Sequence, residues 1–197
     1  MAFDGFSPKT QIKCHKVVDL KRAVFLDRDG VVNRAPLIEG LPHSPRSVRE
    51  LEIMPGVREA VSILLDFNYE IVVVTNQPDI SRGLLQNDEL DKIHKEISSQ
   101  TGIKHFFFCI HDNQHRCACR KPKPGMLIYA ALELNLSLER SFLVGDRRKD
   151  IQAGQEAGCQ CFFIDYEYPE KLPDQPFYRV ASLLEAAVLI TENQNAK

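Results

Sequence analysis

The sequence predicts an α/β protein with a doubly wound parallel sheet, that is, a sheet with helices on both faces. Two observations support this prediction. Short apolar runs alternate along the chain with amphipathic segments of helical period, and this alternation is typical of parallel sheets. Several of the runs also end in Asp, Thr or Gly-Asp, as expected of strands whose carboxyl ends meet at a ligand site.

The predicted elements follow from local patterns. Apolar runs rich in β-branched or aromatic residues predict strands at 23–26, 71–75, 105–110, 141–144 and 160–164. Apolar residues at helical spacing predict helices at 56–67, 87–100, 126–134, 149–157 and 182–190. The segments 33–55 and 165–178 are expected to be loops. His94, in the second helix, is expected on the helix surface.

Composition limits the possible classes of protein. The 197 residues, 44% apolar and 26% charged, suit one domain with a sizeable core. A net charge of −2 gives no general reason to expect nucleic acid or an anionic membrane as a partner. The sequence shows neither a signal-peptide core nor an apolar run that could span a bilayer. We therefore expect a cytoplasmic protein, and a monomer because no surplus apolar element is evident.

The domain is expected to cover residues 23–197, after an N-terminal extension at 1–22. The extension is polar and shows little periodicity. Its adjacent Cys14 and His15 are of metal-ligand type, but one pair of side chains rarely makes a site. We therefore expect this pair to face solvent.

The first predicted strand ends in two carboxylates one residue apart. Asp27, Arg28, Asp29 and Gly30 follow the apolar run directly. An Asp-Gly turn explains part of this pattern. Buried carboxylates at a strand end, however, need a partner or a metal. From these residues alone, a plain turn and a functional site are equally good interpretations.

Three later strands also lead into groups that bind phosphate or metals. These groups are Thr75, Asn76 and Gln77 after the second strand, Arg120 and Lys121 after the third, and Asp146 with Asp150 after the fourth. A hydroxyl can donate to a phosphoryl oxygen, and a fixed ammonium is a good partner for phosphate. Because right-handed crossovers bring the carboxyl ends of parallel strands to one edge, we expect these groups to converge.

Four potential metal ligands follow the third strand with the spacing C-x-H-x5-C-x-C. They are Cys109, His111, Cys117 and Cys119. Sulfur and imidazole ligands in this number suit tetrahedral Zn²⁺, although the spacing differs from the common C-x2-C. With four protein ligands the zinc would be structural. Disulfides are the alternative, disfavoured by the lack of an export signal.

These segments resemble the haloacid dehalogenase-like phosphohydrolases. The strings FLDRDGVVN, VVVTNQ, CRKPKPGM and VGDRRKDI match four motifs of that superfamily in order, over residues 23–164. With the Cys/His segment, they are similar to the group of histidinol-phosphate phosphatases and D-glycero-D-manno-heptose bisphosphate phosphatases. The resemblance implies a Rossmann-like fold with a small zinc-binding loop and no large cap domain.

The resemblance also implies Mg²⁺-dependent hydrolysis of a phosphomonoester through an aspartyl-phosphate. Asp27 would be the nucleophile and Asp29 the general acid and base. Mg²⁺ would be held by Asp27, by the backbone carbonyl of Asp29 and by Asp146. Thr75 and Lys121 would bind phosphoryl oxygens.

Further roles are implied for residues around this set. The expected substrate-binding residues are Asn76, Gln77, Arg82 and Arg120. Lys123 is the alternative to Lys121 as the phosphate-binding lysine. Asp150 would either contact the groups that bind the metal, without binding it directly, or hold Lys121 by its charge.

The expected substrate is a small phosphorylated metabolite. Arg82-Gly83 matches the TNQxxxxRG form of the heptose group, whereas Pro78-Asp79 replaces its usual Ser-Gly and the compact Cys/His spacing resembles the histidinol-phosphate group. We predict a D-glycero-D-manno-heptose 1,7-bisphosphate 7-phosphatase. The alternatives are a phosphatase for histidinol phosphate or another small phosphosugar. From a different class, a catalytically silent, zinc-stabilised binding module remains open.

Overall fold

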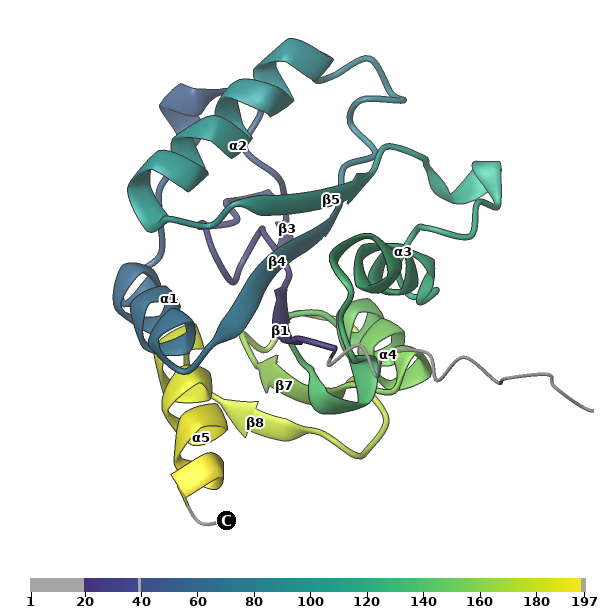
Figure 1. Ribbon diagram of the computed structural model, residues 1–197. Helices are drawn as coiled ribbons and strands as arrows, with labels where there is room; N and C mark the ends of the chain where they lie inside the picture. Colours follow the sequence, from purple (N-terminus) through teal and green to yellow (C-terminus); the bar gives the residue numbers. More distant parts are fainter. Residues whose placement is uncertain (1–19, 39, 196–197) are drawn as a thin grey trace, which may run out of the picture.

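Six parallel strands form the central sheet of the structure, a computed structural model that describes residues 20–38 and 40–195 (Figure 1). Their order across the sheet is β5-β4-β1-β6-β7-β8, and each neighbouring pair is parallel. The strands are β1 (Arg22–Leu26), β4 (Tyr69–Asn76), β5 (His105–Cys109), β6 (Phe142–Gly145), β7 (Gln160–Ile164) and β8 (Tyr178–Val180). The predicted parallel sheet is therefore confirmed.

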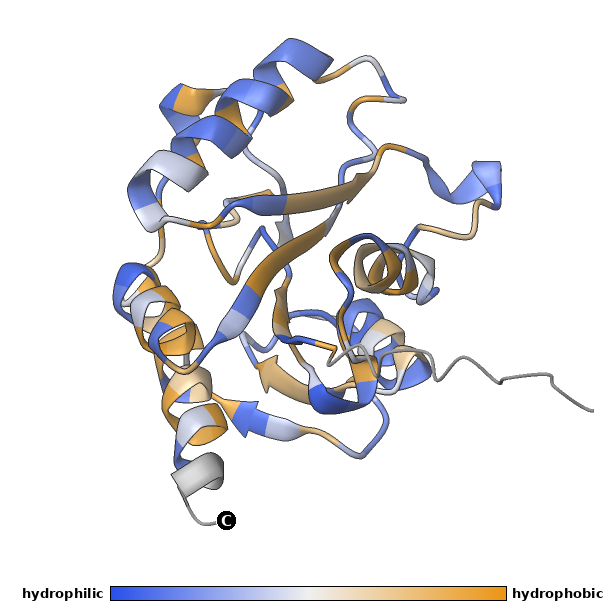
Figure 2. Ribbon diagram, viewed as in Figure 1, coloured by the Kyte–Doolittle hydropathy of each residue, from blue (hydrophilic) through white to orange (hydrophobic). Residues whose placement is uncertain are grey.

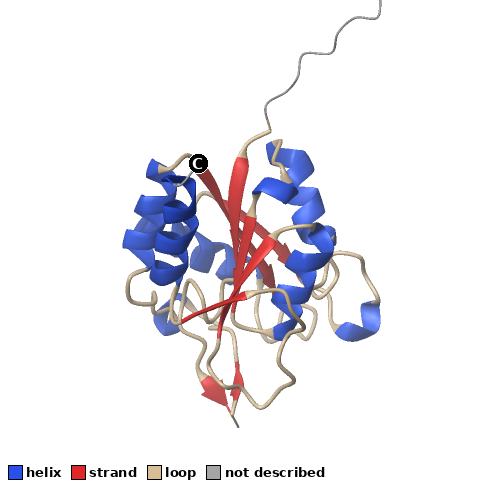
Figure 3. Ribbon diagram, turned by 90° about the horizontal axis from the view of Figure 1, so that it is seen from below, coloured by secondary structure: helices blue, strands red, loops and turns tan. Residues whose placement is uncertain are grey.

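Helices cover both faces of this sheet, as Figure 3 shows. One face packs against α1 (Val57–Asp66), α2 (Asn87–Thr101) and α5 (Leu183–Asn195). The other face packs against α3 (Gly125–Leu134) and α4 (Arg148–Ala157). Short 3-10 helices lie at Val48–Glu50, Asn113–His115 and Leu138–Arg140.

The central strand β1 is buried on both faces. Val24 and Leu26 belong to the core under α1, α2 and α5, whereas Ala23 and Phe25 belong to the core under α3 and α4. This division follows from the alternation of side chains along a strand. Each fully buried side chain of the size of Val, Leu or Phe contributes about 1.5–3 kcal/mol. Figure 2 shows the resulting hydrophobic strands in the middle of the molecule.

The chain reverses the direction in which it adds strands at β1. It first builds β4 and β5 on one side of β1, and then β6, β7 and β8 on the other. In open α/β sheets, ligands bind beyond the carboxyl ends of the strands at such a reversal. The residues that follow β1, β4 and β6 therefore meet at one place.

The structure adds elements that local patterns did not predict. The segment 33–55 contains a small hairpin of β2 (Leu37–Ile38) and β3 (Leu41–Pro42). The segment 165–178, expected to be a loop, leads into the edge strand β8. Both elements are short. They form because they pair with a neighbouring strand, and their hydropathy does not mark them as strands. Within the described ranges, these small additions and the Cys/His segment take the place of a large cap domain.

The expected surface position of His94 is wrong. Its side chain is buried and its ring stacks on that of Phe106, with 4.7 Å between the ring centroids. The apolar stripe of α2 is wider than its aliphatic residues indicate, because the aromatic side chains of β5 lie beneath it.

Some predictions are not tested by the fold. Most of the N-terminal extension, including Cys14 and His15, lies outside the described residues, and so does the end of the C-terminal tail. In the described part of the chain, no helix is both long enough and apolar enough to cross a membrane. The cytoplasmic location and the monomeric state stay predictions.

Candidate active site

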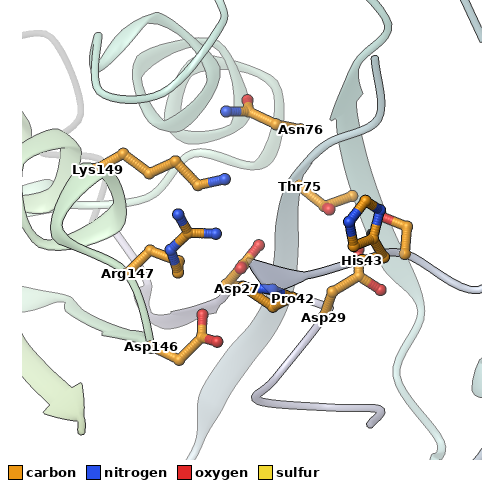
Figure 4. Close-up of a pocket in the computed structure, with 10 residues that line it drawn as sticks. Asp27, Asp29, Pro42, His43, Thr75, Asn76, Asp146, Arg147 and Lys149 are labelled. Carbon is orange, nitrogen blue, oxygen red and sulfur yellow. Dashed lines mark hydrogen bonds between the residues drawn. The ribbon is translucent and has the colours of Figure 1, made fainter. Parts of the chain in front are cut away.

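A small polar cavity of about 50 Å³ lies at the carboxyl end of β1 (Figure 4). Its lining residues come from the ends of β1, β4 and β6, from β3 and the loop after it, and from the start of α4. They are Asp27, Asp29, Pro42, His43, Ser44, Thr75, Asn76, Asp146, Arg147 and Lys149. The cavity thus brings together the groups that the sequence predicts to converge after the first, second and fourth strands.

Lys121 supplies a buried positive charge at this site. Its Nζ donates to Asp27 Oδ1 and to the carbonyl oxygen of Val74, both at 2.7 Å, and lies 2.7 Å from Asp150 Oδ1. Burial alone would lower the pKa of Lys121, but the charges of Asp150 and Asp27 outweigh burial and raise it. Lys123 instead donates to the carbonyl oxygen of Cys117 in the Cys/His segment. The structure therefore places Lys121, and not Lys123, beside the carboxylates, and the phosphate contact of Lys121 stays a prediction.

Asn76 fixes the backbone of Lys121. Its amide nitrogen donates to the Lys121 carbonyl oxygen at 3.0 Å, and its amide oxygen accepts from the Lys121 backbone N–H at 3.1 Å. These two hydrogen bonds tie the end of β4 to the segment that follows the Cys/His cluster. The side chain of Asn76 also lines the cavity.

Three carboxylates crowd together beside Lys121. One oxygen from each of Asp27, Asp146 and Asp150 lies within 4.8 Å of the others. Burial, followed by the charges of the two neighbours, raises the pKa of Asp146 well above its ordinary value. Burial and the charge of Asp150 likewise raise the pKa of Asp27. One lysine cannot balance three carboxylates, so the cluster carries excess negative charge when it is ionised.

The donor set of this cluster fits Mg²⁺. Asp146 Oδ1 is buried without a hydrogen-bond partner, while its Oδ2 accepts from the Tyr168 hydroxyl at 3.1 Å. Mg²⁺ prefers oxygen ligands and binds proteins through one or two carboxylates. Gly30, with a φ of +95°, packs so closely that a Cβ there would overlap the Asp146 carboxylate. The carboxylate of Asp29 is not part of this cluster, and the metal contact of its backbone carbonyl stays a prediction.

Five hydrogen bonds hold the carboxylate of Asp29. Arg28 Nε and Asn33 Nδ2 donate to Oδ1, and Arg28 Nη2, Ser44 Oγ and Gln77 Nε2 donate to Oδ2, at 2.7 to 3.1 Å. Burial alone would raise the pKa of Asp29. The charge of Arg28 and the hydrogen bonds from the other donors outweigh burial and lower it. Asp29 is therefore ionised in this arrangement.

Gln77 lies beneath the cavity rather than in it. Its side chain is wholly buried, and its amide nitrogen donates to Thr75 Oγ1 at 2.8 Å as well as to Asp29. The structure therefore gives Gln77 a supporting position in place of the predicted contact with substrate. Since Thr75 Oγ1 accepts from Gln77, the hydroxyl proton of Thr75 is available to donate into the cavity.

A second, wider cavity of about 200 Å³ adjoins the first and is mainly basic. Its charged lining is Arg82, Arg120, Arg147, Lys149 and one carboxylate, Asp79. Figure 4 shows the Lys149 ammonium pointing into the space above Asp27. Sequence reasoning missed Arg147 and Lys149, although the basic run between Asp146 and Asp150 at the start of α4 is a signal for an anion site.

The two predicted arginines are held by neighbouring loops. Arg82 donates to Asp112 through Nε at 2.7 Å and Nη2 at 3.0 Å. Arg120 donates to Asn113 Oδ1 at 2.9 Å and to the carbonyl oxygen of His111 at 3.0 Å. Both guanidinium groups thus lie at the wall of the basic cavity, and their substrate-binding roles stay predictions.

The Cys/His segment has the geometry of a metal site. Cys109 Sγ lies 3.3 Å from Cys119 Sγ, 3.6 Å from Cys117 Sγ and 3.5 Å from His111 Nδ1. With Zn–S of about 2.3 Å and Zn–N of about 2.0–2.1 Å, tetrahedral ligand atoms lie about 3.6–3.8 Å apart. Among the described residues, all five cysteines are free thiols. The alternative of disulfides is therefore wrong for these three cysteines.

Comparison with known proteins identifies the family. A family model described as HAD-hydrolase-like matches residues 118–186. A D-glycero-beta-D-manno-heptose-1,7-bisphosphate 7-phosphatase from Bordetella bronchiseptica is 35% identical over 73% of this chain and 80% of its own length. The chain belongs to the haloacid dehalogenase-like phosphatase family. The predicted family and its enzyme class, a phosphatase, are thus confirmed.

Other members of this haloacid dehalogenase-like family agree. A protein of the same name from Helicobacter pylori is 29% identical over 80% of this chain and 90% of its own length. The crystal structure of the D,D-heptose 1,7-bisphosphate phosphatase from B. bronchiseptica, complexed with magnesium and phosphate, superposes with a TM-score of 0.76. That structure shares 29% identity and covers 87% of this chain and 99% of its own.

The raised pKa of Asp146 predicts how the metal-free protein responds to pH. A carboxyl with a raised pKa binds its proton more tightly in the folded state, so stability falls as the pH rises from 3.8 through the folded pKa. Asp146→Asn removes this penalty. In EDTA at pH 7, we expect the variant to melt about 2–8 °C above the wild type.

Added Mg²⁺ separates the two proteins. It should raise the melting temperature of the wild type and leave that of Asp146→Asn almost unchanged. The control is Asp174→Asn, at an exposed carboxylate, which should respond as the wild type does. An equal Mg²⁺ response in Asp146→Asn would show that Asp146 does not hold the metal.

Proposed function

We propose that this protein hydrolyses the 7-phosphate of D-glycero-D-manno-heptose 1,7-bisphosphate in a Mg²⁺-dependent reaction. The observation that carries the proposal is a pair of adjoining cavities that differ in their balance of charge. In the lining of the inner one, which holds Asp27, carboxylates outnumber cations. In the lining of the outer one, four cations accompany a single carboxylate, and Arg147 and Lys149 line both cavities. The inner cavity suits a reacting phosphoryl group with a metal, and the outer one suits a second phosphate.

The first step is attack of Asp27 on phosphorus. Lys121 donates to Asp27 Oδ1, which leaves Oδ2 as the attacking atom. The P–O ester bond breaks as the new P–O bond forms, and the alkoxide takes a proton from Asp29. Thr75 and Lys121 donate to the phosphoryl oxygens. Bound Mg²⁺, held by Asp27, the Asp29 carbonyl and Asp146, would offset repulsion between the carboxylates and the phosphate.

The second step releases phosphate from the aspartyl-phosphate. Asp29 takes a proton from water, which attacks phosphorus and regenerates the Asp27 carboxylate. The ionised state of Asp29 suits this step. For the first step Asp29 must be protonated, and the arriving phosphate favours protonation because a nearby like charge raises the pKa of a carboxyl. Ser44 lines the cavity, so its hydroxyl is the donor that a leaving-group oxygen can replace on Asp29.

The outer cavity supports a bisphosphate substrate. Arg120, in the segment after the Cys/His cluster, and Lys149, in the first turn of α4, contribute positive charge. Arg82 is held by Asp112, which supports a role in bracing the cavity wall as well as the predicted contact with substrate. Histidinol phosphate carries one phosphate and would leave these cations without an anionic partner.

A structural zinc completes the proposal. Cys109, His111, Cys117 and Cys119 would hold it, and Arg120 and Lys121 follow the last ligand directly. Zinc would therefore fix the segment that carries Arg120 to the outer cavity and Lys121 to Asp27 of the inner one.

Substrate preference tests the proposed function. We expect Mg²⁺-dependent phosphate release from one anomer of the heptose 1,7-bisphosphate with a kcat/KM at least about 10²-fold above that for histidinol phosphate, because the lost contact is a charged one. The panel also contains the other anomer and para-nitrophenyl phosphate. A preference for histidinol phosphate would assign the protein to the other group. Failure to hydrolyse any of the four, with Mg²⁺ bound, would favour the silent binding module.

Asp27→Asn tests the nucleophile. The substitution keeps the shape of the side chain and removes the attacking oxygen, so we expect phosphate release to fall by about 10⁴-fold or more. The circular dichroism spectrum and Mg²⁺-free melting temperature should show an intact fold. Turnover at the wild-type rate would exclude Asp27 as the nucleophile.

Metal analysis tests the zinc site. We expect one zinc per chain in the purified protein, and loss of that zinc in Cys119→Ser. The variant should also melt at a lower temperature and have a raised KM, because the segment with Arg120 and Lys121 loses its support. The matched control is Cys159→Ser, at a buried cysteine outside the cluster, which should keep its zinc. Equal zinc content in both variants would contradict this site.

A further inference from the structure

Arg28 is the largest of the fully buried side chains among the described residues. It stands between the two carboxylates of the strand end, Asp27 and Asp29, and its side chain extends away from the cavity toward α2. Burying a guanidinium is costly, and a buried ion pair is a poor source of stability compared with apolar packing. The stability of the fold therefore does not account for an arginine at this position.

The guanidinium of Arg28 forms a two-pronged contact with Asp29. Nε donates to Oδ1 at 3.0 Å and Nη2 donates to Oδ2 at 3.1 Å. Two parallel hydrogen bonds of this kind fix the plane of a carboxylate as well as its position. Without them the terminal torsion of an aspartate has a broad minimum. Of the four side chains that donate to Asp29, Arg28 alone contacts both carboxylate oxygens, and so it fixes the plane in which the other three donors hold them.

His94 supports the third nitrogen of the guanidinium. Arg28 Nη1 lies 3.4 Å from His94 Nε2, and the His94 ring lies against Phe106 and Phe108. Burial, followed by the charge of Arg28, lowers the pKa of His94 to about 3. The imidazole is therefore neutral, and its Nε2 can accept from Arg28 when Nδ1 carries the proton. Through Arg28, this contact connects His94 of α2 with Asp29. His94 lies on the side of Arg28 that is away from the cavity.

From this geometry we infer that Arg28, backed by His94, is a positioning residue that aims Asp29 at the leaving-group oxygen. The inference rests on the proposed phosphatase function. Neither side chain touches the substrate. Proton transfer requires donor and acceptor within about 2.6–3.2 Å in a fixed direction, and the Arg28 contact supplies that direction.

The leaving group provides a readout that a purely structural role would not move. When the ester bond of an alkyl phosphate breaks, its electron pair goes to an alkoxide oxygen, which takes the proton of Asp29. The para-nitrophenolate of an aryl phosphate leaves without a proton. Because kcat/KM reports only the steps up to phosphoryl transfer, it separates this proton transfer from the later attack of water.

The test compares Arg28→Met with the wild type on two substrates. For the best alkyl phosphate of the panel, we expect kcat/KM to fall about 10²–10³-fold, the range of a lost acid catalyst. For para-nitrophenyl phosphate, we expect a loss below about tenfold. The matched control is Arg34→Met, at an exposed arginine with the same two-pronged contact to Glu52, which should change neither value. Equal losses on both substrates would overturn the inference.

Two further variants keep the test valid if Arg28→Met folds poorly. His94→Phe keeps the stacking and removes the acceptor, so we expect a smaller loss with the same preference for the alkyl substrate. In an Asp29→Asn background, Arg28→Met should lower the alkyl rate by less than about threefold, because the residue to be positioned is already absent. If Arg28→Met lowers the alkyl rate by the same factor in the Asp29→Asn background as in the wild type, the inference is contradicted. A wild type that hydrolyses neither substrate would contradict the proposed function instead.

Discussion

The buried contact of Lys121 with Asp27 and Asp150 is the interaction on which the site depends. It joins a segment after β5 to the end of β1 and to the first turn of α4, and Asn76 fixes the backbone of Lys121 from β4. A lone buried ammonium would cost several kcal/mol, as would each unpaired carboxylate. The three groups are tolerated in the interior only together. The position of Lys121 in turn depends on the Cys/His cluster, whose last member lies two residues earlier. This dependence explains why the Cys/His segment lies so close to the candidate active site.

Charge is separated across the two cavities in a way that suits a phosphorylated substrate and a cation. Carboxylates outnumber cations in the inner cavity, and the unpaired Asp146 Oδ1 adds to its need for a metal. Cations predominate in the outer cavity, where Arg82 is paired with Asp112 and Arg147 with Glu170. An anion that spans both cavities would meet a metal at one end and cations at the other. This arrangement favours a substrate with two phosphates over a substrate with one.

Much of this could be predicted from the sequence because it depends on local patterns. Five of the six parallel strands are continuous apolar runs, and Asp27, Thr75 and Asp146 directly follow or end such runs. The remainder depends on tertiary contacts. Lys121 and Lys123 are two residues apart and chemically alike, and only the packed structure separates them. His94 and Gln77 look like surface or substrate-facing residues in sequence, yet both are buried beneath the site because they pair with Arg28 and Asp29.

The alternation in Asp27-Arg28-Asp29 has a physical meaning that follows from the fold. Asp27 belongs to the cluster of three carboxylates, whereas the side chain of Arg28 turns toward α2. The guanidinium of Arg28 can therefore contact Asp29 without entering the cavity. The same residue therefore withdraws Asp29 from the group of clustered carboxylates and gives it a different environment from that of Asp27. Burial and like charges raise the pKa of Asp27, whereas Arg28 helps to lower that of Asp29. Two carboxylates one residue apart can then perform different tasks, since their surroundings, rather than their chemistry, distinguish the nucleophile from the proton carrier.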